Sequence, residues 1–322
     1  MKIILPGGTG NIGRWLVRAL ARDGHECVVL TRRLQPDAAD ATGARQIAWD
    51  GKTAGPWCAE FEGADAVINL AGRTVDCRYH ERNLTEMMDS RVDSTRAVGA
   101  AIAAARRPPR VWLQMSTATI YAHRFDAPND ERTGHIGGDE PGVPALWRRS
   151  IDIARAWEAA LDAAPTPHTR RVALRTAVVM IPERTGAFHV MARHSRLGFG
   201  RFGDGRQWMS WLHADDLVAA IRFLLARDDL AGAINLCAPE PLPNGEFLAT
   251  LRTALGRSVG MPVPRWALEI GVFFLRTESE LVLKSRRVVP ARLLASGFEF
   301  RFSDWPSAAA DLVKTWRRAP TP

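Results

Sequence analysis

The stretch Gly7-Gly8-Thr9-Gly10-Asn11-Ile12-Gly13 constrains the fold of this chain more than any other feature. It fits both GxGxxG and GxxGxxG, and it lies between a short apolar run and a segment with helical apolar spacing. Glycines at these positions let the backbone approach a pyrophosphate, and the following helix directs its unpaired N–H groups at the anion. An ordinary glycine turn is the alternative. The strand, loop and helix context favours a nucleotide-binding loop.

Strand-like and helical segments alternate through the first half of the chain. The patterns predict strands at 2–5, 26–31, 45–49, 66–70, 111–116 and 171–181, and helices at 12–24, 84–105 and 146–163. Strands that alternate with helices in this way are typical of βαβ units. We therefore predict an α/β fold built on a doubly wound parallel sheet.

The second half has a looser pattern. A glycine-rich segment at 198–207 is expected to line a pocket, and a helix at 216–227 and a strand at 233–237 follow it. We predict a nucleotide-binding domain of residues 1–181 and 212–238. Residues 182–211 and 239–322 are expected to form a smaller C-terminal α/β lobe, with a cleft between the two. In that lobe, 278–287 resembles an amphipathic, charge-laced helix with a structural or interface role.

Composition excludes several classes of function. The net charge of +8 comes almost wholly from arginines, which are spread along the chain, so nucleic-acid binding is disfavoured. The chain has no apolar run of about 18 residues, and its N-terminus is too short in apolar residues for a signal peptide. We expect a cytoplasmic protein without membrane contact. No CxxC or Cys/His cluster joins Cys27, Cys58, Cys77 and Cys237, so neither a metal site nor a disulfide framework is indicated.

The end of the predicted second strand indicates which nucleotide is bound. An NAD-preferring site normally has an acid there, whereas this chain has Leu30-Thr31-Arg32-Arg33. A planar, permanently charged guanidinium suits a 2′-phosphate, so the residues predict NADP(H), with Arg32 as the main contact. The alternative is that Arg33 simply faces solvent.

These residues resemble the extended short-chain dehydrogenase/reductase superfamily, the group of nucleotide-sugar epimerases and dehydratases with a Rossmann-type fold. The segments that carry the resemblance are Gly7 to Gly13, Asn69-Leu-Ala-Gly72 and Ser116-Thr-Ala-Thr-Ile-Tyr121. Further segments resemble a little-characterised epimerase-like subfamily, sometimes labelled the cell-division-inhibitor type: Ser210-Trp-Leu-His-Ala-Asp-Asp216, Asn235-Leu-Cys-Ala-Pro239, and Val289-Pro with Gly297-Phe-Glu-Phe300.

The resemblance implies particular site residues. Leu70, Ala71 and Gly72 would pass under the sugar and phosphate portion of the cofactor, and Thr117 would hydrogen-bond a substrate carbonyl or alcohol. Capping of its own backbone is the alternative for Thr117. The full set expected to bind the cofactor is Gly7, Thr9, Gly10, Asn11, Ile12, Gly13, Thr31, Arg32, Arg33, Leu70, Ala71, Gly72, Met115 and Ser116.

The catalytic pair of that superfamily is missing. Its members use Tyr-x-x-x-Lys on one helical face, where the lysine lowers the pKa of the tyrosine. In this chain the tyrosine position falls on Ser150 and the lysine position on Ala154. Neither of the two tyrosines, Tyr79 and Tyr121, is followed by lysine four residues later. The usual proton relay is therefore absent.

If the chain is an enzyme, another group must move the proton. His213 follows the glycine-rich segment and has a suitable unperturbed pKa, although a structural histidine is the alternative. Tyr79, with His80 and Cys77, forms a second candidate cluster, for which a solvated loop is the alternative. Ser150 can still hydrogen-bond a ligand, but an unassisted serine is a poor acid.

Together, these observations predict an NADP(H)-binding, epimerase/dehydratase-like protein. We expect oxidoreductase or epimerase-type activity on an unknown small molecule through an atypical active site. The alternative is a non-catalytic, NADP(H)-sensing regulatory or interaction protein. Related folds often pair through helices, which leaves a homodimer open.

Overall fold

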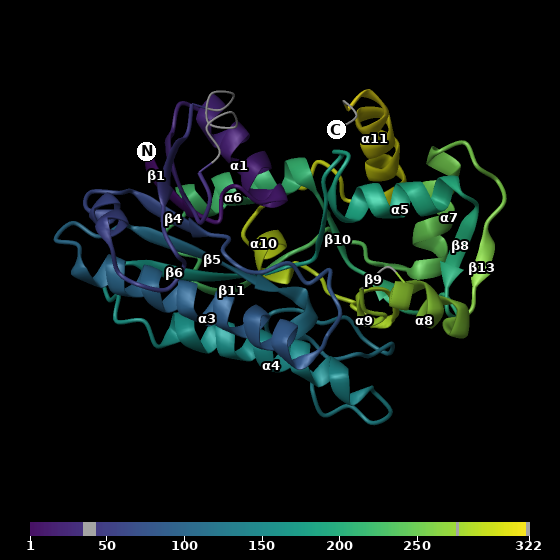
Figure 1. Cartoon of the computed structure of the whole chain (residues 1–322). Coiled ribbons are helices and arrows are strands. Elements are labelled where there is room, and N and C mark those ends of the chain that lie inside the picture. Colours follow the sequence, from purple (N-terminus) through teal and green to yellow (C-terminus); the bar gives the residue numbers. More distant parts are fainter. Residues whose placement is uncertain (35–42, 275–276, 320–322) are drawn as a thin grey trace.

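A seven-stranded sheet in the order β11-β6-β5-β4-β1-β2-β3 forms the centre of the larger lobe (Figure 1). The computed structural model describes residues 1–34, 43–274 and 277–319. All neighbouring strands in this sheet are parallel. The strands are β1 (Lys2–Pro6), β2 (Glu26–Thr31), β3 (Arg45–Ala48), β4 (Ala66–Asn69), β5 (Val111–Thr117), β6 (Arg170–Thr176) and β11 (Gly232–Leu236). This order confirms the predicted doubly wound sheet.

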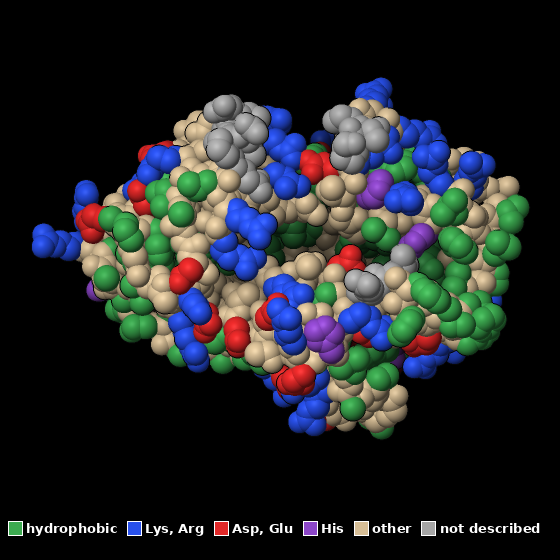
Figure 2. Space-filling model, viewed as in Figure 1, with side chains coloured by type: hydrophobic (Ala, Val, Ile, Leu, Met, Phe, Trp, Pro, Cys, Tyr) green, Lys and Arg blue, Asp and Glu red, His purple; other side chains and the backbone are tan. Residues whose placement is uncertain are grey.

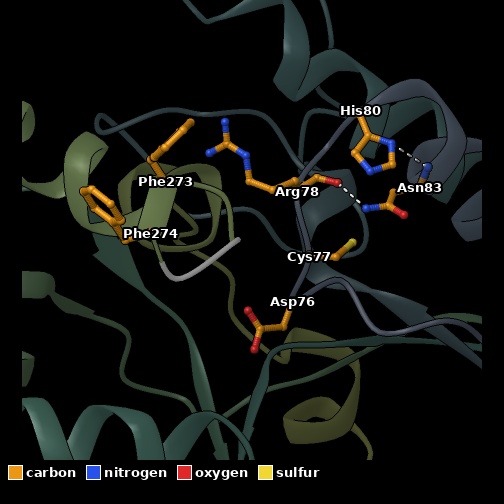
Figure 3. Close-up of a pocket in the computed structure, with 7 residues that line it drawn as sticks. All are labelled: Asp76, Cys77, Arg78, His80, Asn83, Phe273 and Phe274. Atoms are coloured by element: carbon orange, nitrogen blue, oxygen red, sulfur yellow. Dashed lines mark hydrogen bonds between the residues drawn. The ribbon is translucent and has the colours of Figure 1, made fainter.

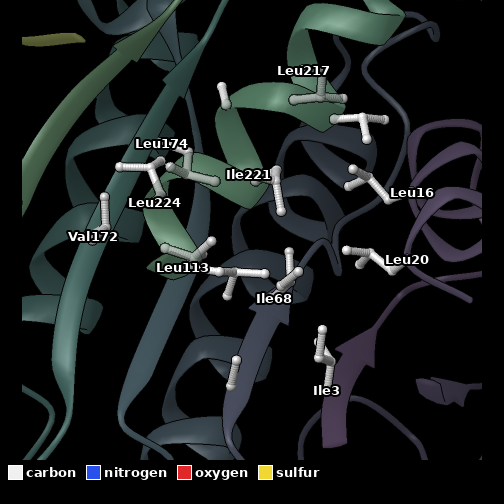
Figure 4. Close-up of a cluster of buried hydrophobic side chains, with 14 of the residues drawn as sticks. Ile3, Leu16, Leu20, Ile68, Leu113, Val172, Leu174, Leu217, Ile221 and Leu224 are labelled. Atoms are coloured by element: carbon white, nitrogen blue, oxygen red, sulfur yellow. The ribbon is translucent and has the colours of Figure 1, made fainter. Parts of the chain in front are cut away.

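Helices cover both faces of the sheet (Figure 1). On one face lie α1 (Asn11–Arg22) and α6 (Ala214–Ala226), and on the other α3 (Glu81–Ala104) and α4 (Ala145–Asp162). Because strand side chains alternate between faces, Ile3 packs in the first layer and Ile4 in the second. Figure 4 shows the first layer, in which Leu16 and Leu20 of α1 meet the strand residues. Burial on both faces explains why the strands are almost continuously apolar.

The predicted strand at 171–181 is two strands. β6 ends at Thr176, and β7 (Val178–Met180) leaves the large sheet to pair in parallel with β10 (Trp211–His213). The prediction of one strand was wrong because apolar residues lie on both sides of Arg175 and Thr176, so the pattern does not show that the pairing partner changes there.

The smaller lobe has its own buried core of aromatic side chains. Its elements are α5 (Gly186–Arg196), β8 (Phe199–Phe202), β9 (Trp208–Met209), β12 (Leu242–Pro243), α7 (Asn244–Ala254), β13 (Met261–Val263), α8 (Arg265–Phe274) and α11 (Trp305–Arg318). In its core the rings of Phe247 and Trp305 stack at 3.8 Å. The short helix α10 (Ala291–Ala295) packs instead on the large sheet, where Leu293 joins the core and Arg292 donates to the Ala233 carbonyl of β11. The predicted domain boundaries stay a prediction, and residues 275–276 and 320–322 of the second unit lie outside the described residues.

The segment at 278–287 is not the helix predicted for it. Only α9 (Glu280–Leu283) is helical, and the side chains of Glu280 and Lys284 are 2% and 0% exposed. The helix ends because other segments bind the backbone that follows: Ser285 N–H donates to His123 Nδ1 at 2.8 Å and Arg286 N–H to the Trp208 carbonyl at 2.8 Å. The charged residues are therefore carried into the interior between the two lobes.

Candidate functional site

The glycine loop after β1 is held by backbone contacts that exclude side chains. A Cβ on Gly7, whose φ is +76°, would lie 2.8 Å from the Ala71 nitrogen, and one on Gly13 would lie 2.5 Å from the Gly8 oxygen. Within the described part of the chain, a Cβ on Gly10 would meet only the Gly7 oxygen, at 3.5 Å. Protein packing therefore requires glycine at two of these positions, whereas the space beside exposed Gly10 is left free for something else.

The N-terminus of α1 faces the same space. The helix begins after Gly10 without a side-chain cap and has no acid in its first turn. Arg14 braces the loop by donating to the Thr9 carbonyl at 3.1 Å and to Asn11 Oδ1 at 2.9 Å. N–H groups without a side-chain cap, together with the dipole of the helix, suit the pyrophosphate of a dinucleotide.

Arg32 and Arg33 lie at the adjacent end of β2. Both side chains are exposed, and Thr31 is buried with its hydroxyl 3.2 Å from that of Thr9. The Arg33 N–H donates back to Thr31 Oγ1 at 3.3 Å, which turns the chain at the strand end. The end of β2 lies beside the glycine loop, since Gly7 N–H donates to the Leu30 carbonyl at 2.9 Å. Contact of either arginine with a 2′-phosphate stays a prediction.

The loop after β4 lies against the glycine loop at the point where the strand order reverses. Leu70 N–H donates to the Pro6 carbonyl at 2.9 Å, and Ala71 N–H donates to Asn69 Oδ1 at 3.1 Å. Crevices at such reversals are where doubly wound sheets bind nucleotides. Gly72 follows in the same loop and packs against the side chain of Arg91.

The side chains of Met115 and Ser116 make hydrogen bonds to other residues of the protein. Thr176 Oγ1 donates to the Met115 sulfur at 3.0 Å, and Ser116 Oγ donates to Glu158 Oε1 at 2.6 Å. Any contact of these two residues with a cofactor would therefore be made by the backbone.

Thr117 and Ser150 have different surroundings. The Thr117 hydroxyl accepts the Thr119 N–H at 3.1 Å at the start of η2 (Ala118–Ile120), which is the capping alternative considered above. Its hydroxyl proton is still available to a ligand. Ser150 on α4 donates to Glu280 Oε2 at 2.6 Å, a contact across 130 residues of sequence.

Tyr79 reaches Ser150 from the loop between β4 and α3. Its side chain is buried, which raises the pKa of the phenol, and a hydrogen bond with Ser150 opposes that rise. The solvated-loop alternative holds instead for His80, which is exposed and caps α3 by accepting the Asn83 N–H at 3.4 Å. The predicted cluster is therefore divided: Tyr79 turns inward and His80 stays at the surface.

A hollow of about 830 Å³ lies beside this loop, between it and the end of α8. Figure 3 shows that its walls carry charged and aromatic groups, with the Arg78 guanidinium 5.2 Å from the centre of the Phe273 ring. The same face of the molecule is hollowed between the two lobes, with Lys and Arg side chains on the rim (Figure 2). A small molecule thus has space beside the loop that carries Tyr79.

Sequence reasoning missed Glu280, Lys284 and Arg286. Lys284 Nζ lies 3.7 Å from Glu280 Oε1 and donates to the Thr119 carbonyl at 2.8 Å, while Arg286 Nε donates to Thr119 Oγ1 at 3.1 Å. Burial lowers the pKa of Lys284 to about 8 and raises the pKa of Glu280. Glutamate and lysine four residues apart are typical of a solvent-facing helix, so the local sequence carries no signal of this burial.

His213 has a structural environment. It is 1% exposed, and its Nδ1 accepts the Asp215 N–H at 3.1 Å to cap α6. Its ring lies 4.0 Å from that of Phe302, and Nε2 is 3.5 Å from Asp311. These partners favour the structural alternative over proton transfer. Tyr121 is also tied into the core, since its hydroxyl donates to Asn235 Oδ1 at 2.9 Å.

The glycine-rich segment at 198–207 is ordered by strand pairing and buried hydrogen bonds, and its expected role in lining a pocket stays a prediction. Its first part is β8, and Gln207 is buried and donates to the carbonyls of Phe202 and Val282, both at 3.0 Å. Within the described ranges no group of acidic, histidine or cysteine side chains is arranged to hold a metal ion. In the same ranges no helix has the length and apolar character needed to cross a membrane.

Comparisons with known proteins agree with this geometry. Residues 3–141 match the NAD dependent epimerase/dehydratase family, and residues 263–312 match a domain of unknown function, DUF1731. The chain is 31% identical to the epimerase family protein SDR39U1 of Homo sapiens over 319 residues, 97% of this chain and 100% of the relative. It is 28% identical to the epimerase family protein YfhF of Bacillus subtilis, over 97% of this chain and 98% of the relative.

A solved structure resembles the whole chain. The crystal structure of human SDR39U1 (isoform 2) with NADPH has a TM-score of 0.82 and 30% identity, covering 98% of this chain and 99% of that one. The fold, the glycine loop and the similarity to relatives over nearly the whole chain lead to the same family assignment. The chain belongs to the NAD dependent epimerase/dehydratase family.

Proposed function

We propose that this protein binds NADPH in the crevice between the β1 and β4 loops and transfers hydride between it and a small carbonyl or alcohol. The observation that carries the proposal is the glycine loop, in which Cβ atoms on Gly7 and Gly13 would collide with backbone while Gly10 borders open space. The crystal structure of the human relative with NADPH supports the same cofactor.

The residues present fit this cofactor. The glycine loop and the N-terminus of α1 would hold the pyrophosphate, and Arg32 would bind the 2′-phosphate. Leu70 to Gly72 would pass under the sugars, as their contacts with the β1 loop suggest. When bound, NADPH supplies the hydride. Thr117 would direct its hydroxyl proton at the substrate oxygen.

A second candidate function is NADP(H) sensing without catalysis. The observation that favours it is the pair Ser150 and Ala154 at the positions of the usual tyrosine and lysine. In that case bound cofactor would stabilise one arrangement of the two lobes, which a partner would recognise. A homodimer also stays a prediction.

Calorimetric titration with NADPH and NADH, followed by a hydride-transfer screen against small carbonyl compounds, tests the proposal. We expect NADPH to bind more tightly and to be oxidised. Tight binding of NADPH without turnover would favour the sensing function, and no binding of either nucleotide would refute both.

A further inference from the structure

Side chains from three distant parts of the chain meet where the usual catalytic tyrosine would lie. Ser150 comes from α4 and Tyr79 from the loop after β4, while Glu280 and Lys284 come from the C-terminal segment. Tyr79, Glu280 and Lys284 are buried, and Ser150 is only partly exposed. Ionisable side chains therefore surround Ser150, which stands at the position of the usual tyrosine.

We propose that Ser150 and Glu280 form the acid–base pair of this protein, with Lys284 as a positioning residue. The proposal rests on the NADPH-dependent hydride transfer proposed above. In this proposal the proton relay uses the carboxyl of Glu280, which belongs to the smaller lobe. The pair exists only while the smaller lobe lies against α4.

The hydrogen bonding of Glu280 departs from that of a structural ion pair. One oxygen, Oε2, accepts from Ser150 at 2.6 Å, but Oε1 is buried and has no hydrogen-bond partner among the residues that the structure describes. Lys284 lies 3.7 Å from Oε1, and its hydrogen bond goes to the Thr119 carbonyl instead. A buried carboxylate oxygen without a donor is costly, and protonation of the carboxyl lowers that cost because it removes the charge.

The charges around Glu280 are of both signs. Arg286 and Lys284 on its own segment favour the carboxylate, whereas burial favours the neutral acid and is the largest effect, so its pKa is raised. Tyr79 faces it from the β4 loop and Ser150 from α4, both as uncharged hydroxyls at neutral pH. Further from Glu280, Glu140 and His123 face Lys284.

This arrangement permits a balanced proton transfer. As the substrate carbonyl carbon accepts the hydride, its oxygen gains an electron pair and takes the proton of Ser150 Oγ. Ser150 recovers a proton from neutral Glu280, which becomes a carboxylate beside Lys284 and Arg286 and is later reprotonated by solvent. Oxidation of an alcohol runs the same steps in reverse, with Ser150 donating to the carboxylate as in the structure.

The first test is a titration of Glu280 by NMR on protein labelled at the glutamate carboxyl carbon, with and without NADPH. Glu280→Gln assigns the resonance, and Glu269→Gln on exposed α8 is the matched control. We expect Glu280 to titrate above the ordinary range of glutamate and Lys284→Met to raise its midpoint further. A carboxyl that titrates within or below the ordinary range would overturn the pair.

The second test is single-turnover oxidation of NADPH by 9,10-phenanthrenequinone, with NADPH binding measured by calorimetry on each variant. Ser150→Ala and Glu280→Gln should each slow the reaction about 100-fold or more and remove its pH dependence, with NADPH affinity unchanged. Glu269→Gln should match the wild type. Equal rates in all variants, or no turnover by wild type that binds NADPH, would overturn the pair. Failure to bind NADPH would refute the proposed function instead, and the NMR titration would still report on Glu280.

Discussion

Gly10 and Gly13 lie in the same loop, yet the structure predicts opposite consequences for alanine at the two positions. Among the described residues, a Cβ on Gly10 would meet one atom, the Gly7 oxygen, at 3.5 Å, and the φ of −70° at Gly10 is open to any residue. Gly10→Ala should change the free energy of unfolding by less than about 1 kcal/mol, because the gain from restricting the unfolded chain is opposed by the lower preference of alanine for the N-cap position of α1. The new methyl group would occupy the space where we place the pyrophosphate. NADPH affinity should therefore fall at least about tenfold.

Gly13→Ala is the contrasting change. Its Cβ would lie 2.5 Å from the Gly8 oxygen and 2.6 Å from the Gly8 carbonyl carbon, both backbone atoms that cannot rotate away. Such overpacking costs about 1–3 kcal/mol, offset by about 1 kcal/mol of helix propensity. A net loss of stability of up to about 2 kcal/mol is expected, with weaker NADPH binding because α1 is displaced.

Urea denaturation and calorimetric NADPH titration of the wild type, Gly10→Ala and Gly13→Ala separate the effect on stability from the effect on cofactor binding. The expected pattern is stable, weakly binding Gly10→Ala and destabilised Gly13→Ala. If Gly10→Ala bound NADPH as tightly as the wild type, the open space would not be the cofactor site. If it unfolded as easily as Gly13→Ala, the packing argument would be wrong.

Three further predictions concern single residues. Arg32→Ala should weaken NADPH about 10-fold or more and leave NADH affinity nearly unchanged, as measured by calorimetry; equal losses for both nucleotides would refute the phosphate contact. Burial lowers the pKa of Lys284 to about 8 from its ordinary 10.5. Between these pH values the unfolded chain binds more protons than the folded one, so the free energy of unfolding should rise with pH from about 8 to 10.5. Lys284→Met should abolish this rise in urea denaturation, and an unchanged slope would show that Lys284 is not responsible. His213→Ala should cost about 0.5–2 kcal/mol through loss of the α6 cap without changing NADPH affinity, and an unchanged thermal midpoint would contradict the structural role.

The cofactor half of the site was predictable from the sequence because its determinants are local. The glycine spacing, the apolar run before it and the helical pattern after it all lie within 24 residues, and Arg32 and Arg33 directly follow the next strand. Parallel strands bring their carboxyl ends to one edge, so the loops after β1, β2 and β4 had to meet there. The structure places these residues together at that edge.

The proposed catalytic half depends on contacts that no local pattern encodes. The sequence alone showed that Tyr-x-x-x-Lys is missing, but it predicted an amphipathic, charge-laced helix with a structural or interface role at 278–287, because the glutamate and lysine spacing there fits a helix. Only the tertiary structure takes that backbone into hydrogen bonds with Trp208 and His123 and buries Glu280 against Ser150, 130 residues away. A local pattern determines which residues can share one element, whereas the packing of the smaller lobe on α4 decides which distant charges lose their water and acquire shifted pKa values.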